Sequence, residues 1–146
     1  MHTVLSLIAR ICLAGIFLGS AVNKMLNTPE TVAMMAKQGV PAPNLMILGA
    51  IAFLLVGGIS VVLGLFTRIG TLLLMIFLVL ATYFFHDFWT LEGAEARQEL
   101  IAFQKNVGLF GGLLFLFANG PGLCSLDRRR IVRRTVVVEE PALPED

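Results

Sequence analysis

Apolar residues run in four long blocks along the chain, separated by short polar segments. The apolar residues are nearly continuous within each block, which is the pattern of a helix surrounded by lipid rather than of an amphipathic helix or a half-buried strand. The blocks predict four transmembrane helices, over about residues 3–26, 44–66, 69–89 and 100–118. At roughly 1.5 Å per residue, each crosses or nearly crosses a hydrocarbon core of about 30 Å. The third is extended to Trp89, because an indole suits the membrane interface.

Composition agrees with a membrane protein. The chain has 146 residues, of which 57% are hydrophobic and 14% are charged, whereas about 25% are charged in an average soluble domain. The mean hydropathy is +0.85. We therefore expect an all-α four-helix bundle over residues 1–126 and a basic, then acidic tail over 127–146. Arg10 interrupts the first block, and no basic residue precedes it, so we interpret this block as a retained helix rather than a cleaved signal.

The distribution of arginines predicts the orientation. Arg68 lies between the second and third helices, five arginines follow the fourth within residues 128–134, and Arg10 is near the N-terminus. By the positive-inside rule, both termini should be cytoplasmic. The loops 27–43 and 86–99 should then face outward. We interpret the arginine run as a topology determinant with a secondary contact to anionic lipid, and not as a nucleic-acid site.

Small residues predict how the helices pack. Two GxxxG pairs stand in the first and fourth helices, at Gly15 with Gly19 and at Gly108 with Gly112. Small residues at this spacing let helix backbones approach closely in lipid. At the opposite boundary, Arg10 and Asp127 are expected to pair in a structural role.

Polar side chains gather at the outer ends of three helices. They are Asn23, Lys24, His86, Asp87, Lys105 and Asn106. Ionisable groups within a membrane indicate a functional site by default, so these six residues form a candidate ligand site. A structural lock between the helices needs the same residues, and Lys24 alone suits interfacial anchoring. Lys105 shares a helix face with Gly108 and is expected to point into the bundle.

Sequence motifs for catalysis are missing. We find no phosphate-binding glycine loop, no HExxH and no nucleophile elbow, so no catalytic residue can be named. His86 has no second His or Cys near it in sequence, which favours a hydrogen-bonded role over a metal site. Cys12 and Cys124 are interpreted as inert thiols on the cytoplasmic side.

Several segments stand out by their order and spacing. They are Arg10 with Phe17, Gly19 and Lys24, "QGVP" at 38–41, "VGGISVVLGLFTR" at 56–68, "FFHDFW" at 84–89, "FQKNVGLFGGLL" at 103–114 and "GPGLCSLD" at 120–127. Together they resemble the DoxX-like family of small four-helix membrane proteins, over about residues 10–127. Members often carry a glutamate in the second helix, where this chain has Phe53 and Leu54. Asp87 is then the candidate counter-ion for Lys24 or Lys105.

The resemblance implies a bacterial-type plasma (inner) membrane location and a link to quinone-linked oxidoreductases, including thiosulfate:quinone oxidoreductase and terminal quinol oxidases, or to oxidative-stress assemblies. Two hypotheses stay open. In the first, the chain is an accessory subunit of a redox membrane complex, with an outer-leaflet pocket for a quinone head group or small anion. In the second, it is a non-enzymatic scaffold or binding module whose polar cluster locks the helices. A homo-oligomer is compatible with both. The lack of a broken helix and of an internal repeat speaks against a transporter.

Overall fold

The computed structural model describes residues 2–86, 88–122 and 124–127, and most of this part of the chain is helical. The elements are α1 (His2–Leu26), α2 (Thr28–Lys37), α3 (Pro43–Leu63), α4 (Thr67–Phe85), the 3₁₀ turn η1 (Phe88–Thr90) and α5 (Gly93–Asn119). Within the described residues, four helices are long and apolar enough to cross a membrane, namely α1, α3, α5 and α4 with its continuation through η1. The predicted number of spans is therefore confirmed.

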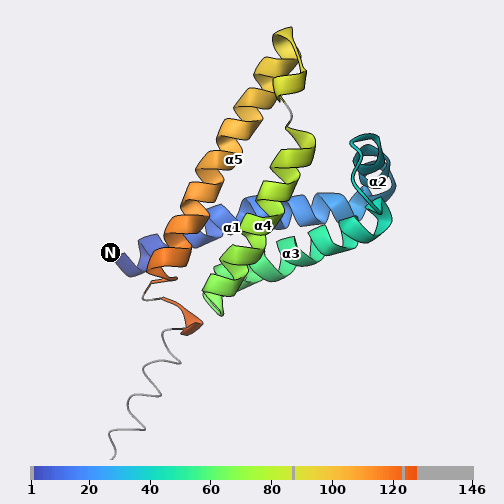
Figure 1. Cartoon of the computed structure of the whole chain (residues 1–146). Helices are drawn as coiled ribbons and strands as arrows, with labels where there is room; N and C mark the ends of the chain where they lie inside the picture. The colour runs from blue at the N-terminus through green and yellow to red at the C-terminus, as the bar shows by residue number, and fades with distance from the viewer. Residues whose placement is uncertain (1, 87, 123, 128–146) are drawn as a thin grey trace, which may run out of the picture.

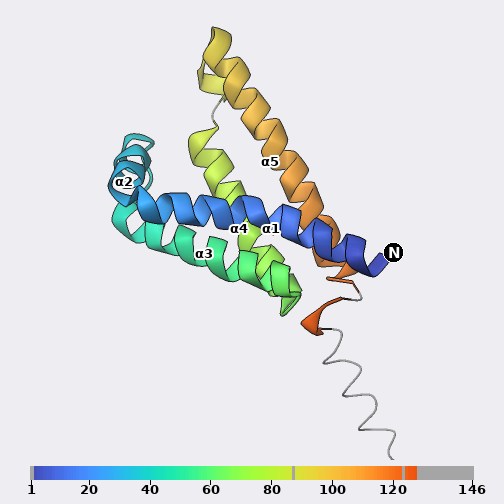
Figure 2. The ribbon, with the colours of Figure 1, turned by 180° about the vertical axis from the view of Figure 1, so that it is seen from behind.

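The four long helices form an open arrangement (Figure 1). α1 and α3 lie side by side, α4 packs on α3, and α5 packs along α4 but has few contacts with α1. The view from behind shows α5 diverging from the α1–α3 pair, with α2 at the end of that pair far from the N-terminus (Figure 2). The compact bundle expected from the sequence is thus incomplete on the α5 side.

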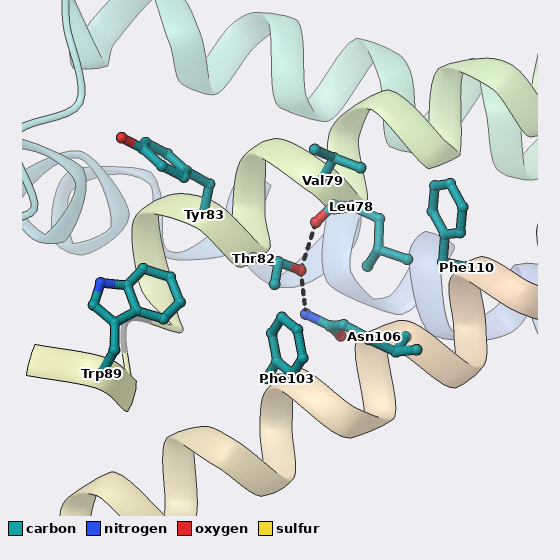
Figure 3. A pocket seen from close by; sticks show the side chains of 9 residues that line it. Leu78, Val79, Thr82, Tyr83, Trp89, Phe103, Asn106 and Phe110 are labelled. Carbon is teal, nitrogen blue, oxygen red and sulfur yellow. Dashed lines mark hydrogen bonds between the residues drawn. The ribbon is translucent and has the colours of Figure 1, made fainter. Parts of the chain in front are cut away.

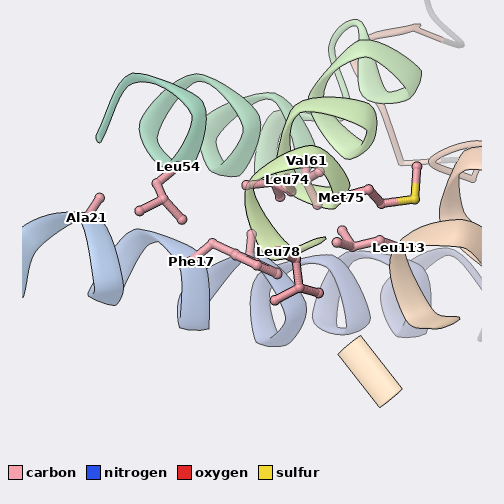
Figure 4. Close-up of a cluster of buried hydrophobic side chains, with 9 residues drawn as sticks. Phe17, Ala21, Leu54, Val61, Leu74, Met75, Leu78 and Leu113 are labelled. Atoms are coloured by element: carbon pink, nitrogen blue, oxygen red, sulfur yellow. The ribbon is translucent and has the colours of Figure 1, made fainter. Parts of the chain in front are cut away.

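The main core lies where α1, α3 and α4 meet (Figure 4). Phe17 of α1, Leu54 of α3 and Leu78 of α4 are buried together there, and α5 adds Leu113. Only 11% of the most apolar window of α5 is buried, against 22% or 28% in the other three spans. The first three long helices therefore supply most of the core, and α5 is the least enclosed of the four spans.

Two glycines bring α3 and α4 close together. A Cβ added at Gly57 would lie 2.7 Å from Leu74 Cγ and 2.9 Å from the carbonyl oxygen of Gly70. A Cβ added at Gly70 would lie 2.6 Å from the Cβ of Ser60. These separations are shorter than van der Waals contact, so this helix pair can approach as it does only with glycine at both positions.

Of the four glycines in the two GxxxG pairs predicted to pack the bundle, only Gly112 lies close to another helix within the described residues. Gly15, Gly19 and Gly108 are exposed, and a Cβ at any of them would meet nothing within 4 Å. A Cβ at Gly112 would reach Leu13 of α1, at 3.6 Å, in ordinary contact. The prediction was wrong because the spacing identifies a smooth helix face without identifying what covers it.

A short helix, α2, occupies residues 28–37, where a loop was expected. Glu30 in its first turn and Lys37 in its last complement the helix dipole. Met35 is buried against Ile47 of α3, together with residues at the end of α4. The prediction missed α2 because the segment is too short and too polar to resemble a span.

Arg10 is almost fully buried, with 2% of its surface exposed. Its Nη1 donates to the carbonyl of Val62 at 3.3 Å, its Nε donates to Ser6 at 3.4 Å, and its Nη2 donates to the carbonyl of Cys124. The last-turn carbonyls of a helix lack partners within it. Arg10 thus completes the C-terminal end of α3 and holds the segment after α5 against it.

Asp127 performs the corresponding task at the start of α4. Its carboxylate accepts hydrogen bonds from the backbone N–H groups of Phe66 and Thr67, at 2.8 and 2.9 Å, and from the Thr67 hydroxyl at 3.0 Å. Phe66 has φ of 50°, which is unusual for a residue with a side chain. Among the described residues, the hydrogen bonds of Arg10 go to backbone carbonyls. The expected direct Arg10–Asp127 pair is therefore replaced by two adjacent helix caps.

Candidate functional site

A cavity of about 560 Å³ lies at the end of the molecule where α2 packs, enclosed by α1, α2, α3 and α4 with a contribution from α5. We call it the main cavity. Its polar lining residues are Ser20, Asn23, Lys24, Thr31, His86 and Asn106. Its aromatic and methionine lining residues are Phe17, Phe53, Phe77, Phe84, Phe85, Met34, Met35 and Met46. A mainly apolar wall with a few polar groups, at this volume, is typical of small-molecule sites.

The structure brings together four of the six predicted site residues. Asn23, Lys24, His86 and Asn106 all line the main cavity. Lys105 is exposed and does not line it, so the expectation that Lys105 points inward was wrong. Successive residues of a helix are about 100° apart, and α5 is turned so that Asn106 faces α4. Asp87 lies outside the described residues.

Lys24 is the ammonium group of the main cavity. Its Nζ donates to Ser20 Oγ at 3.1 Å and lies 5.7 Å from the centroid of the Phe77 ring, a cation–π distance. Among the described residues, no carboxylate forms an ion pair with it. An ammonium has three donors, so the side chain keeps donor capacity for an oxygen of a ligand in the cavity.

His86 ends α4 and is paired with Glu99 of α5. The His86 Nδ1 lies 2.7 Å from Glu99 Oε2. The sequence placed Glu99 in a loop over residues 86–99, whereas α5 already begins at Gly93. The pair therefore joins two helices, and one of its members, His86, lines the main cavity.

Asn106 lies between the main cavity and a second, shallower depression of about 290 Å³ between α4 and α5. Figure 3 shows this α4–α5 groove, with Trp89 and Phe103 on its walls. The Asn106 Nδ2 donates to Thr82 Oγ1 at 2.9 Å, and the Thr82 hydroxyl donates to the carbonyl of Leu78 at 2.7 Å (Figure 3). Asn106 therefore lines both the groove and the main cavity while it is bonded to α4.

Three contributors to the site were missed or undervalued by sequence reasoning. Ser20 and Phe77 were not among the predicted site residues. Glu99 was the last residue of the expected 86–99 loop. Glu99 is followed, at helical spacing, by apolar residues and by a glutamine and a lysine. This pattern is the signal that would have shown Glu99 to be helical.

Metal binding finds no support in the geometry. In the part of the chain that the structure describes, no three His, Cys, Asp or Glu side chains group closely enough to hold a metal ion. His86 has a carboxylate as its partner instead.

Four candidate membrane spans around a mainly apolar cavity define a class of small polytopic membrane proteins. The chain belongs to the DoxX family, whose family model, described as DoxX, matches residues 5–87. The matched region ends after α4, so it includes Lys24 and His86 but not α5.

Two relatives from Escherichia coli (strain K12) are similar along most of their length. The inner membrane protein YphA is 37% identical over 126 residues, which cover 86% of this chain and 90% of YphA. The inner membrane protein YqjF is 31% identical over 122 residues, or 84% of this chain and 88% of YqjF. No solved structure matches the chain. The chain is an integral inner membrane protein, as these relatives are.

Proposed function

We propose that this DoxX family protein is a membrane subunit that binds a lipophilic molecule of the quinone class in its main cavity, beside a redox partner that supplies the electrons. The observation that carries the proposal is the position of Lys24, an ammonium with spare donors on the wall of an otherwise aromatic cavity. The chain's own part is to bind and orient the head group.

The chemistry of the cavity suits a quinone ring. A quinone carbonyl oxygen accepts hydrogen bonds, and Lys24 and Asn106 can donate them. The five phenylalanines on the wall offer faces and edges for stacking on a flat ring. Methionines from α2 and α3 add adaptable apolar surface for a tail.

The proposed topology gives the site a position in the membrane. With both termini in the cytoplasm, the end of the molecule that holds α2 lies in the outer half of the bilayer. Arg10 and Arg68, which lie at the other end, support this orientation. A lipophilic ligand would then enter the main cavity from the outer leaflet.

Exchange of Lys24 for methionine is expected to weaken quinone binding by about tenfold or more, because a hydrogen bond to a charged donor contributes roughly 1.5–3 kcal/mol. Binding of decylubiquinone to the purified protein can be followed by quenching of Trp89, the only tryptophan. The matched control is Lys105→Met, on an exposed lysine outside the cavity, which should leave Kd within about twofold.

Equal effects of the two lysine substitutions on the Kd of decylubiquinone would contradict the proposal.

The alternative function is a scaffold whose polar cluster locks the helices together. It is favoured by the two bonds that join α4 to α5, from His86 to Glu99 and from Asn106 to Thr82. It predicts that Glu99→Leu, which removes the bond to His86, lowers the thermal midpoint, and that the native chain does not bind decylubiquinone.

A further inference from the structure

The His86–Glu99 contact determines which nitrogen of the ring carries a proton. The Nδ1 lies 2.7 Å from a carboxylate oxygen. An ionised carboxylate only accepts hydrogen bonds, so Nδ1 is the donor and carries the hydrogen. A partner on one ring nitrogen in this way sets the role of the other nitrogen. When the ring is neutral, this contact leaves Nε2 as an acceptor.

The second nitrogen, Nε2, is not the atom that contacts Glu99. His86 lines the main cavity, whereas Glu99 does not. Among the described residues, no hydrogen-bond partner is recorded for Nε2. A residue of the cavity wall thus carries an acceptor nitrogen, in addition to the donors of Lys24.

We propose that the main cavity selects head groups that carry a hydroxyl donor, and that Glu99 is the positioning residue for this selection. The inference rests on the proposed function, since it concerns the same cavity. A hydroquinone or a lipophilic phenol can donate its hydroxyl hydrogen to His86 while an oxygen accepts from Lys24. A ligand whose oxygens can only accept hydrogen bonds can bind to Lys24 but not to the acceptor nitrogen of His86.

The test compares 4-decylphenol with 4-decylanisole, which keeps the oxygen acceptor but has no hydroxyl hydrogen. At one fixed pH, the native protein should bind the phenol about tenfold more tightly, as expected for one net hydrogen bond. Glu99→Leu should reduce this preference to less than about threefold. Glu95→Leu, at an exposed acid one turn earlier on α5, should retain it.

A spectroscopic readout separates positioning from a purely structural role. The chain has 2 histidines, His2 and His86, so ¹⁵N-histidine labelling of a His2→Gln variant isolates the His86 ring. We expect the hydrogen on Nδ1 in the native background and a mixture of tautomers after Glu99→Leu. If Glu99→Leu does not fold, Glu99→Gln serves instead, because an amide can either donate or accept and so relaxes the constraint.

The outcomes separate this inference from the proposed function. If decylubiquinone binds but the native protein takes the phenol and its methyl ether equally well, the hydroxyl selection is wrong and the proposed function stands. If the preference survives Glu99→Leu with a mixed tautomer, Glu99 is not the positioning residue. If none of the three molecules binds, both proposals fail.

Discussion

Arg10→Leu is expected to lower the free energy of unfolding by about 3 kcal/mol. The guanidinium is almost fully buried and donates hydrogen bonds to the carbonyls of Val62, Ser6 and Cys124. Each buried acceptor that is left without a partner costs roughly 1–3 kcal/mol. A leucine fills much of the space but donates nothing. In detergent, the thermal midpoint should fall by roughly 10 °C.

Two companion variants sharpen this test. Arg97→Leu, at an exposed arginine of α5, removes the same charge without stranding a buried carbonyl and should change the midpoint by less than about 2 °C. Arg10→Lys should fall in between, because an ammonium cannot reproduce the planar fork that reaches several carbonyls at once. A native-like midpoint for Arg10→Leu would show that Arg10 does not hold the two segments together.

Gly57→Ala is expected to destabilise the α3–α4 pair, whereas Gly49→Ala on the same helix is expected to be neutral or stabilising. A methyl group at Gly57 would lie 2.9 Å from the backbone oxygen of Gly70, so the helices must separate. Overpacking of this kind costs about 1–3 kcal/mol. At Gly49 nothing lies within 4 Å, and alanine is intrinsically better in a helix by roughly 1 kcal/mol.

The comparison is decisive because the two glycine substitutions are expected to change the stability of the protein in opposite directions. Thermal unfolding of both variants in one detergent shows the difference directly. If Gly57→Ala melted at or above the temperature of Gly49→Ala, the close crossing of α3 and α4 would not exist as described.

The spans could be predicted from the sequence because bilayer thickness alone sets their length. The predicted first helix and α1 both end at Leu26, although the third predicted helix ran past the end of α4 at Phe85. How the helices face one another could not be predicted in the same way. The glycine pairs of α1 and α5 have the spacing of packed helices, yet the crossing of α3 and α4 is one that needs glycine, at Gly57 and Gly70.

The candidate site was predicted in part for a related reason. The depth of a residue along its helix can be read from the sequence, and it placed Asn23, Lys24, His86 and Asn106 at one depth in the membrane. The rotation of a helix about its axis cannot be read from the sequence where both faces are apolar, so Lys105 was assigned to the interior together with its neighbour Asn106. The partner of His86 was hidden because the start of α5 in a polar segment gives no hydropathy signal.

Photolabelling with an azidoquinone that carries a decyl chain tests the central claim most directly, because it maps the ligand onto residues of the native protein. After irradiation and mass spectrometry, we expect labels on main-cavity residues such as Met34, Met46 and Phe84, and we expect excess decylubiquinone to remove them. Labels confined to lipid-facing residues of α5 such as Leu114 and Phe115, and unaffected by the competitor, would contradict a quinone site in the main cavity.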